Sequence, residues 1–287
     1  MDVAVVGAGR VGTAVAVLLR EAGHRIVALS GRDETESRAG RYLPGVPVTD
    51  AASAARDAEL VILGVPDDAI APTAERLAKD GALHEGQWVA HLAGASGLDE
   101  LAAVGATGAR AFAIHPLQTL PDVDRALERI PGSTIAVTAH DEEGYALGER
   151  LAHDLRGKPF RLADERRPLY HAAAVFASND LIATVALGEQ LFGAAGVPDP
   201  HGATVALVRA TVDNLAAMGP EAALTGPAVR GDAGTIAKNL EALRRSAPAA
   251  IPAYVQLARV ALDLAVRGGR LHEDGRARVE EVLARWT

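Results

Sequence analysis

The sequence predicts a doubly wound α/β domain with a parallel sheet, followed by an all-α C-terminal domain. Short apolar runs rich in β-branched residues alternate with helix-period stretches up to about residue 162. Beyond about residue 164 the strand patterns stop and long helix-period segments follow one another. A glycine-rich turn directly follows the first apolar run. These observations predict two domains, 1–163 and 164–287.

The strands are expected at short apolar runs, and the helices of the second half lie between Gly and Pro residues. The run Leu60-Val61-Ile62-Leu63 is apolar on both faces, as in a strand that helices cover on both sides. The expected strands are 2–7, 25–30, 59–65, 87–92, 110–114, 133–138 and 158–162. The expected helices are 167–195, 200–218, 233–246, 249–267 and 273–285, with Gly219-Pro220 among the breaks between them.

The composition of the chain argues against several classes of function. The 287 residues carry a net charge of -8 and no basic stripe, which argues against a nucleic-acid partner. The absence of cysteine excludes disulfides, thiolate metal sites and a cysteine nucleophile, and no metal site is predicted. No secretory signal is readable at the start of the sequence. The apolar stretch Ala172–Leu187 is too short for a membrane span. We therefore expect a cytoplasmic protein with no membrane partner, in which this stretch is a buried helix.

The glycine-rich turn reads Gly7-Ala8-Gly9-Arg10-Val11-Gly12 and opens a helix that runs to about Ala22. Gly7 permits the tight turn, Gly9 lets the backbone approach a diphosphate, and Gly12 lets helix and strand pack closely. The diphosphate would lie at the helix N-terminus, near Arg10 and Val11, where free N–H groups favour an anion. Strand, motif, helix and second strand occur in the order of a Rossmann dinucleotide-binding unit. The alternative is a glycine-rich turn in a fold that has lost its ligand.

The end of the second strand indicates which nicotinamide cofactor binds. NAD enzymes place an acidic residue there to hold the ribose 2′-OH, whereas this chain has Ser30-Gly31-Arg32. A hydroxyl and a guanidinium suit a 2′-phosphate, so the sequence predicts NADP(H). In the alternative, Asp33 holds the ribose and Arg32 is a solvated surface charge. Arg38 and Arg41 are interpreted as ordinary helix-face charges, and the alternative is that they assist Arg32 in holding the phosphate.

Two further strand ends are expected at the same edge of the sheet. After the strand at 59–65, Val65 and Pro66 should line the ribose and nicotinamide, and Asp67 is expected to cap the next helix. After the strand at 87–92, His91 should shape the nicotinamide pocket together with Gly94 and Ser96, and Ser96 is a candidate substrate contact.

Seven motifs along the chain carry a resemblance to known proteins. They are Gly7-x-Gly9-x-x-Gly12, Val65-Pro66-Asp67, His91-x-x-Gly94, His115-Pro116-Leu117-Gln118-Thr119, Tyr170-His171-Ala172, Ser178-Asn179 and Gly226-Pro227-x-x-Arg230-Gly231-Asp232. With these motifs the sequence resembles a bacterial family of Rossmann-like oxidoreductases with a poorly characterised helical C-terminal domain. More distantly it is similar to ketopantoate reductase, pyrroline-5-carboxylate reductase, prephenate dehydrogenase and 6-phosphogluconate dehydrogenase.

The resemblance implies a helical C-terminal domain that often dimerises, an active site between the domains, and ketopantoate as a candidate substrate. One departure matters. Ketopantoate reductase and the 6-phosphogluconate type of enzyme have a lysine one turn before an asparagine on the first helix of the second domain. Asn179 matches the asparagine, but the position four earlier is Val175, and no lysine lies between 159 and 237. Another side chain is therefore required to donate the proton that this lysine would supply.

Histidine is the natural replacement, because hydride transfer to a carbonyl needs a proton donor near the accepting oxygen. His115 ends a strand at the carboxyl edge, and His115-Pro116 resembles the His-Pro of prephenate dehydrogenases, where the histidine contacts the reacting hydroxyl. The alternative for His115 is a buried histidine bonded to backbone. His171, Ser178 and Asn179 lie along one helix face at offsets of seven and eight and are predicted to face the cleft. The alternative for these three is a buried polar network.

In the C-terminal half, Arg230 is a candidate clamp for a substrate carboxylate, and Asp232 is expected to be an N-cap. The function predicted for the whole chain is an NADP(H)-dependent oxidoreductase acting on a small carbonyl substrate such as a 2-oxo acid. The alternatives are a non-catalytic NADP(H)-binding sensor and a deazaflavin-dependent oxidoreductase. The long apolar helices 172–195 and 249–267 favour a homodimer.

Overall fold

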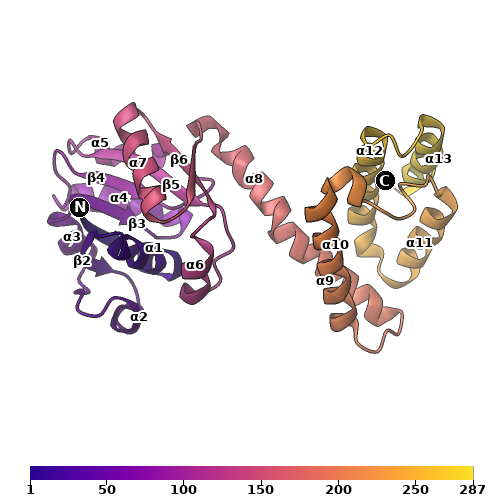
Figure 1. Ribbon diagram of the computed structural model, residues 1–287, viewed down its shortest axis with the longest axis horizontal. Coiled ribbons are helices and arrows are strands. Elements are labelled where there is room, and N and C mark those ends of the chain that lie inside the picture. Colours follow the sequence, from indigo (N-terminus) through magenta and orange to yellow (C-terminus); the bar gives the residue numbers. More distant parts are fainter. Residues whose placement is uncertain (287) are drawn as a thin grey trace. The chain divides into compact units, whose positions relative to one another are not determined.

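The structure, a computed structural model, describes residues 1–286 and divides into two compact units, Met1–Ser178 and Asn179–Thr287. The expected boundary at 163/164 precedes helix α8 (Arg167–Ala177), which belongs to the first unit. The strands expected from the sequence are all present, each within a few residues of its expected bounds (Figure 1). They are β1 (Asp2–Val6), β2 (Arg25–Ser30), β3 (Leu60–Leu63), β4 (Trp88–His91), β5 (Arg110–Pro116), β6 (Thr134–Ala139) and β7 (Lys158–Arg161).

These strands form one sheet in the order β2-β1-β3-β4-β5-β6-β7. The first five strands run parallel, as the sequence predicts, but β6 pairs antiparallel with β5, and β7 follows β6 in parallel. The fold class is confirmed, with a sheet that is mostly rather than wholly parallel. The chain leaves β1 toward β2 on one side and reaches β3 on the other, so the strand order reverses between β1 and β3. Open α/β sheets bind ligands at the carboxyl ends of the strands beside such a reversal.

Helices cover both faces of the sheet, and the strand residues alternate between the two layers. Val3 and Val5 of β1 pack in the cluster that includes residues of α1, α6 and α7. Ala4 and Val6 pack in the opposite cluster, which includes residues of α3, α4 and α5. This alternation is the period of two expected of a strand buried on both sides. The helices of this unit before α8 are α1 (Arg10–Glu21), α2 (Thr35–Tyr42), α3 (Ala51–Arg56), α4 (Ile70–Lys79), α5 (Ala102–Gly105), α6 (Val123–Arg129) and α7 (Glu142–Asp154).

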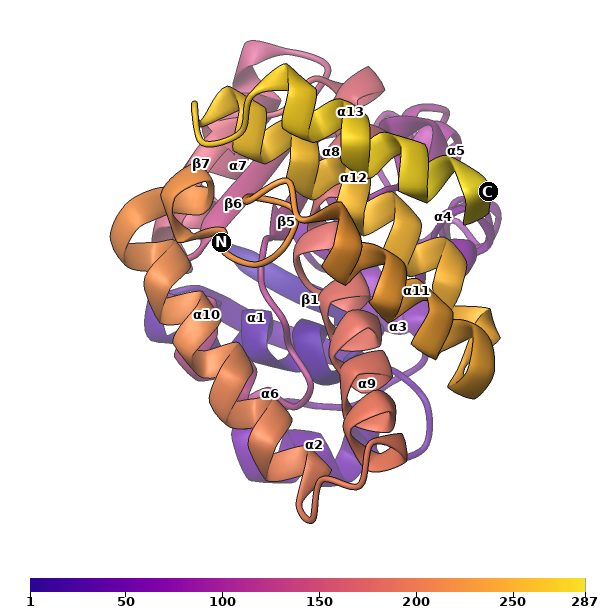
Figure 2. The same ribbon diagram turned by 90° about the vertical axis from the view of Figure 1, so that its right-hand side faces the viewer.

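The second unit is helical, and its core lies among its last three helices (Figure 2). Ile236, Leu240, Leu262 and Val279 are fully or almost fully buried there. The predicted break at Gly219-Pro220 is confirmed, since Gly219 has φ 77° and kinks the helix. Asp232 accepts from the Thr235 N–H at 3.0 Å, which confirms the predicted N-cap. The helices are α9 (Asn179–Ala194), α10 (Pro200–Ala223), α11 (Ala233–Ser246), α12 (Ile251–Arg267) and α13 (Glu273–Leu283).

The helix expected at 167–195 differs from the prediction in two ways. It is interrupted at Ser178, whose φ of -127° and ψ of -69° lie outside the helical region. It is also exposed: α9 has no buried residue, so the expected buried helix is not found. The reason is that α9 contacts α10 but contributes nothing to the core formed by α11, α12 and α13. Two helical stretches, Asp164–Ala194 and Pro248–Arg267, are long and apolar enough to cross a membrane by length and composition. Of the most apolar segment in each, 0% and 22% of the residues are buried.

Candidate cofactor and active site

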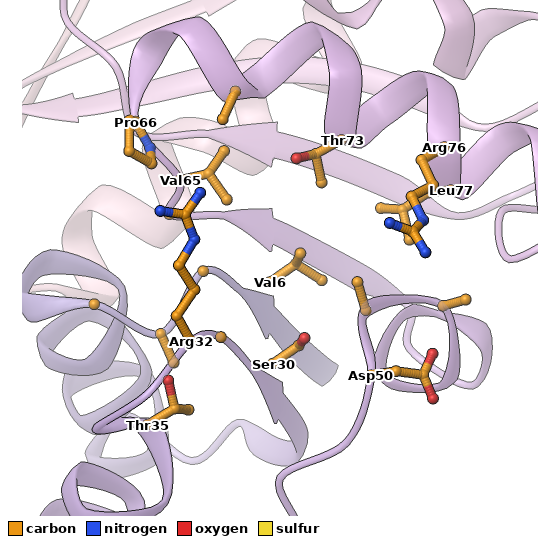
Figure 3. A pocket seen from close by; sticks show the side chains of 18 of the residues that line it. Val6, Ser30, Arg32, Thr35, Asp50, Val65, Pro66, Thr73, Arg76 and Leu77 are labelled. Carbon is orange, nitrogen blue, oxygen red and sulfur yellow. The ribbon is translucent and has the colours of Figure 1, made fainter.

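A cavity of about 700 Å³ lies at the carboxyl ends of β1, β2 and β3 in the first unit. Its walls come from the glycine-rich turn, the residues after β2 and β3, and one face of α4 (Figure 3). The cavity therefore occupies the point where the strand order reverses. Of the predicted cofactor-binding residues, Gly7, Gly9, Ser30, Arg32, Val65 and Pro66 line it.

The geometry of the turn confirms why its glycines are needed. Gly7 has φ +93°, and a Cβ there would lie 2.7 Å from the backbone of Gly64. A Cβ on Gly12 would lie 2.5 Å from the Gly7 carbonyl oxygen, so α1 can pack this closely on β1 only without one. Gly9 is different, because its Cβ would meet nothing closer than 4.0 Å. The backbone at Gly9 thus borders open space, and no side chain caps the N-terminus of α1.

Arginines and hydroxyls line the wall of the cavity that follows β2. The Arg32 side chain is exposed and extends into the cavity (Figure 3). Ser30 is 7% exposed, and its carbonyl oxygen accepts from the N–H groups of Gly7 and Ala8 at 2.8 Å each. The Thr35 hydroxyl is buried without a hydrogen-bond partner within residues 1–286. Asp33 is not among the lining residues, so the geometry favours Arg32 over Asp33 as the ligand contact.

Two further arginines line this cavity, of which sequence reasoning named Arg38 only as an alternative and Arg76 not at all. Arg38 lines it, and its Nε donates to the Ala8 carbonyl at 3.1 Å, which holds the guanidinium beside the glycine turn. Arg76 of α4 lines the opposite wall, and its Nε lies 3.7 Å from Asp80 Oδ2. Arg38 was interpreted as a helix-face charge; its spacing of six residues from Arg32 carried no signal that both reach one cavity.

The predicted N-terminal helix residues lie beside the cavity rather than in its wall. Arg10 donates to the Pro121 carbonyl at 2.9 Å, and neither Arg10 nor Val11 is a lining side chain. Any contact they make with an anion would come from their backbone N–H groups. Asp67 does not cap α4, since the N-cap is Ala69; its Oδ2 instead accepts from the Ser96 hydroxyl at 3.4 Å.

A second cluster of polar side chains gathers around Gly94, at the ends of β4 and β5. His115 Nδ1 lies 2.8 Å from the Tyr170 hydroxyl, and the two rings are perpendicular with centroids 5.6 Å apart. The His171 ring centroid is 6.5 Å from that of His115. A Cβ on Gly94 would lie 2.7 Å from His171 Nδ1 and 2.9 Å from His115 Nε2. The structure thus brings two predicted catalytic residues together, and it needs glycine at position 94 to do so.

Arg167, fully buried at the start of α8, holds this cluster in place. Its guanidinium donates to the carbonyl oxygens of Ala93 and Ser96 and to the Thr138 hydroxyl, the last at 2.9 Å. The Asp164 carboxylate accepts from the Leu98 N–H at 3.1 Å. The loop after β4 is therefore tied to the start of α8 by hydrogen bonds to a buried cation and to a carboxylate. Buried cations need such partners, because an unpaired one is costly.

His91 is fully buried, and both of its ring nitrogens are bonded to backbone. Nε2 lies 3.3 Å from the Gly97 carbonyl oxygen, and Nδ1 accepts from the Ala93 N–H at 3.2 Å. His91 does not line the cavity and has no free nitrogen for a cofactor. Its contacts instead fix the conformation of the loop that carries Gly94 and Ser96.

Burial keeps the two histidines at the strand ends neutral. Burial, reinforced by the charge of Arg167, lowers the pKa of His91 to about 3. Burial and then the charges of Arg167 and His171 lower the pKa of His115 to about 4. Burial raises the pKa of Tyr170 to about 12. At neutral pH His115 is therefore an uncharged imidazole, and it cannot be the charged acid that a pKa near 7 would provide.

The remaining predicted residues belong to the end of α8 and to the second unit. Ser178 ends α8 seven residues after His171, which is about 10 Å along a helix. Asn179 and Arg230 belong to the second unit, and Arg230 is exposed. The residues that sequence reasoning passed over are Tyr170 and Arg167. Tyr170 stood in a quoted motif, but nothing in its spacing indicated a bond to a residue 55 positions away.

Comparisons with known proteins agree with this architecture. Residues 1–116 match the family model of a Rossmann-like domain, and residues 133–261 match a domain of unknown function, DUF2520. The chain therefore carries the pair of domains that the sequence resemblance implies. No protein with a curated functional record matches the sequence.

Solved structures share the fold over nearly the whole chain. A candidate NADP oxidoreductase from Bacteroides fragilis is 24% identical with a TM-score of 0.74, over 91% of this chain and 98% of that one. A protein from Thermotoga maritima is 22% identical with a TM-score of 0.72, over 92% and 98%. Pyrroline carboxylate reductase from Plasmodium falciparum, solved with NADP bound, is 10% identical with a TM-score of 0.59, over 97% and 98%. At these identities the likeness shows the fold.

Proposed function

We propose that this protein is an NADP(H)-dependent oxidoreductase that transfers a hydride to or from a small carbonyl or imine compound. The observation that carries the proposal is the cavity at the reversal of strand order, where an uncapped helix N-terminus and the Arg32 side chain border the same space. One end of that space suits a diphosphate and the other a second phosphate group.

Different residues of the cavity hold different groups of the cofactor in this proposal. The backbone at Gly9 and the first N–H groups of α1 hold the diphosphate, because nothing else occupies the space there. Arg32, with the hydroxyls of Ser30 and Thr35, holds a 2′-phosphate, and the unpartnered Thr35 hydroxyl gains a hydrogen bond by doing so. Val65 and Pro66 contact the ribose next to the nicotinamide. When bound, the cofactor supplies or accepts the hydride.

The names of structural neighbours support this assignment. The Bacteroides fragilis and Plasmodium falciparum proteins are described as an NADP oxidoreductase and as a reductase with NADP bound. An imine reductase from a Pseudomonas species has the same fold, with a TM-score of 0.58. Two of these reductases are named for C=N compounds, a pyrroline carboxylate and imines, so reduction of C=O and of C=N substrates must be separated by experiment.

We place the reacting group of the substrate near Gly94, where His115 and His171 converge. His115 and His171 contact the reacting atom, and Ser96 is a further substrate contact in this assignment. We propose Ser178 and Asn179 as further catalytic residues and Arg230 as the contact of a substrate carboxylate. A 2-oxo acid such as ketopantoate is the first substrate to test. A cytoplasmic location follows from the same proposal, because NADP(H) is an intracellular metabolite.

Calorimetric titration with NADPH and NADH tests the cofactor assignment. We expect NADPH to bind at least about tenfold tighter, a preference that Arg32→Ala removes, because a charge-assisted bond to phosphate contributes about 1.5–3 kcal/mol. Arg125→Ala is the matched control, since Arg125 is an exposed arginine of the same unit that does not line the cavity. If neither nucleotide binds, the proposal is wrong, and titration with a deazaflavin follows. Tight NADPH binding without turnover of any oxo acid or imine would favour a sensor.

We further propose that the second unit forms a homodimer through α9 and α10. Ile182 and Leu207 are 68% and 58% exposed, and Met218 is 52% exposed. A membrane is a poor alternative for this face, because Arg209 and Asp213 interrupt α10. Apolar patches of this kind mark interfaces. Light scattering should give a dimer for the native chain and a monomer for Ile182→Glu; a native monomer, or binding to lipid vesicles, would contradict the proposal.

A further inference from the structure

The hydrogen bond between His115 and Tyr170 determines how the histidine presents its other nitrogen. The bond is 2.8 Å long, and Phe160 packs on Tyr170 with ring centroids 5.8 Å apart. Both partners are partly buried and both are uncharged at neutral pH, because burial lowers the pKa of the imidazole and raises that of the phenol. A neutral imidazole carries a single N–H, so one nitrogen donates and the other accepts.

The phenol has to be the donor in this pair. Within residues 1–286 the Tyr170 hydroxyl has no partner other than His115 Nδ1, so its proton is bonded only if it points at that nitrogen. An unprotonated imidazole nitrogen is a stronger acceptor than a phenol oxygen, which favours the same arrangement. With Nδ1 accepting, the ring proton lies on Nε2.

His115 Nε2 is available to a ligand atom. It has no hydrogen-bond partner within residues 1–286, and it is not among the buried polar atoms that lack one, so it reaches the surface. It lies beside Gly94, where a Cβ would lie only 2.9 Å away. A side chain at position 94 would crowd this N–H, so glycine there keeps Nε2 accessible.

We propose that Tyr170 is a positioning residue that fixes His115 as an Nε2–H donor, and that the donor selects carbonyl over iminium substrates. The inference rests on the oxidoreductase function proposed above. A carbonyl oxygen accepts from an N–H, whereas the nitrogen of a protonated iminium ion has no lone pair to do so. The buried cation Arg167 acts in the same direction, because its charge opposes a second positive charge nearby. A neutral imidazole that polarises a carbonyl is an established catalytic arrangement in other enzymes.

The His115–Tyr170 pair supplies the proton that the reduction consumes. As the carbonyl carbon accepts the hydride, the electron pair of the C=O π bond moves to oxygen, and this oxygen takes the proton from His115 Nε2. Nδ1 takes the hydroxyl proton of Tyr170, so the ring is neutral throughout. The resulting phenolate lies in the field of Arg167, which opposes the rise in the Tyr170 pKa. Nε2 then takes a proton from water and Nδ1 returns its proton to the phenolate, which restores the Nε2–H tautomer. In the oxidative direction each proton moves back.

Nitrogen-15 NMR of the histidine rings tests the tautomer without substrate or cofactor. We expect His115 to be protonated on Nε2 in the native chain at pH 7 and to become a mixture of tautomers in Tyr170→Phe, which keeps the ring packing and removes only the hydroxyl. Tyr42→Phe is the matched control, because it also loses one hydroxyl hydrogen bond, at 2.9 Å to Asp124, elsewhere in the same unit. A native ring protonated on Nδ1, or a tautomer that Tyr170→Phe leaves unchanged, would overturn the proposal.

Turnover tests the selection of substrate class. With NADPH, we expect 2-oxo acids to be reduced and the N-methyl-1-pyrrolinium ion, whose nitrogen has no lone pair, not to be, and we expect Tyr170→Phe to lower kcat about tenfold or more while NADPH affinity stays unchanged. Preferred reduction of the N-methyl-1-pyrrolinium ion overturns the inference but leaves the oxidoreductase function standing. Failure of the native chain to bind NADPH refutes the proposed function instead, and the NMR result still decides the tautomer.

Discussion

Replacing Arg167 by methionine tests whether one buried cation holds the active-site loop. Methionine fills a similar volume but provides no donor, so the Ala93 and Ser96 carbonyl oxygens and the Thr138 hydroxyl each lose a bond. Hydrogen bonds to charged groups contribute about 1.5–3 kcal/mol each. Part of this loss is offset, because the unfavourable burial of the charge is also removed. We expect the free energy of unfolding to fall by about 3 kcal/mol.

Urea unfolding followed by tryptophan fluorescence measures this loss. The chain has two tryptophans, and in a Trp286→Phe background the signal comes from Trp88, which is partly buried against the core of the first unit. With a slope of about 2 kcal/mol/M, a loss of about 3 kcal/mol lowers the midpoint by about 1.5 M. Arg129→Met is the control, since within residues 1–286 that arginine bonds only to Thr119, at an exposed site, and its replacement should cost less than about 1 kcal/mol.

The same variant separates the two causes of the low His115 pKa. Burial is the larger cause and the charge of Arg167 the next, so Arg167→Met should raise the pKa from about 4 without reaching the ordinary value of 6.5. An NMR titration of the His115 ring measures it. The reasoning is refuted if the urea midpoint moves no further than in Arg129→Met, or if the His115 pKa does not rise.

Other consequences can be measured in the same way. Gly94→Ala should lower turnover about tenfold or more with NADPH affinity unchanged, because its Cβ would displace His115 and His171; unchanged turnover would contradict the site. Gly12→Ala should lower the free energy of unfolding by about 1–3 kcal/mol and weaken NADPH binding, since its Cβ would meet the Gly7 carbonyl; calorimetry that shows native affinity would argue against the turn as the diphosphate site. The folded-state pKa values of His91 and His115 lie below the ordinary value of 6.5, so the unfolded chain binds more protons between pH 6.5 and about 4. Stability should therefore fall as the pH is lowered through this window, by about 2 kcal/mol per histidine at pH 5, and equal urea midpoints at pH 7 and pH 5 would contradict the burial of these rings.

Patterns local in sequence predicted most of the fold. The strands were recognisable because residues buried on both faces must be apolar at every position, as in Leu60–Leu63. The break at Gly219 and the cap at Asp232 were recognisable because a left-handed φ and a free helix N-terminus each demand particular residues. The glycine turn was recognisable for the same reason. The antiparallel direction of β6 could not be predicted, because the residue pattern of a strand is the same whichever way the strand runs in the sheet.

The amino-acid sequence by itself determined the fold class, the glycine turn and the basic residue after β2, since each depends on neighbours within a few positions. Only the tertiary structure decided that Arg38 and Arg76 reach the same cavity as Arg32, and that Tyr170 bonds to His115. It also decided that His115 is neutral, because a pKa depends on burial and on charges that distant segments bring together. Contacts between segments far apart in the chain produce no periodicity or spacing in the sequence, so only the tertiary structure shows them.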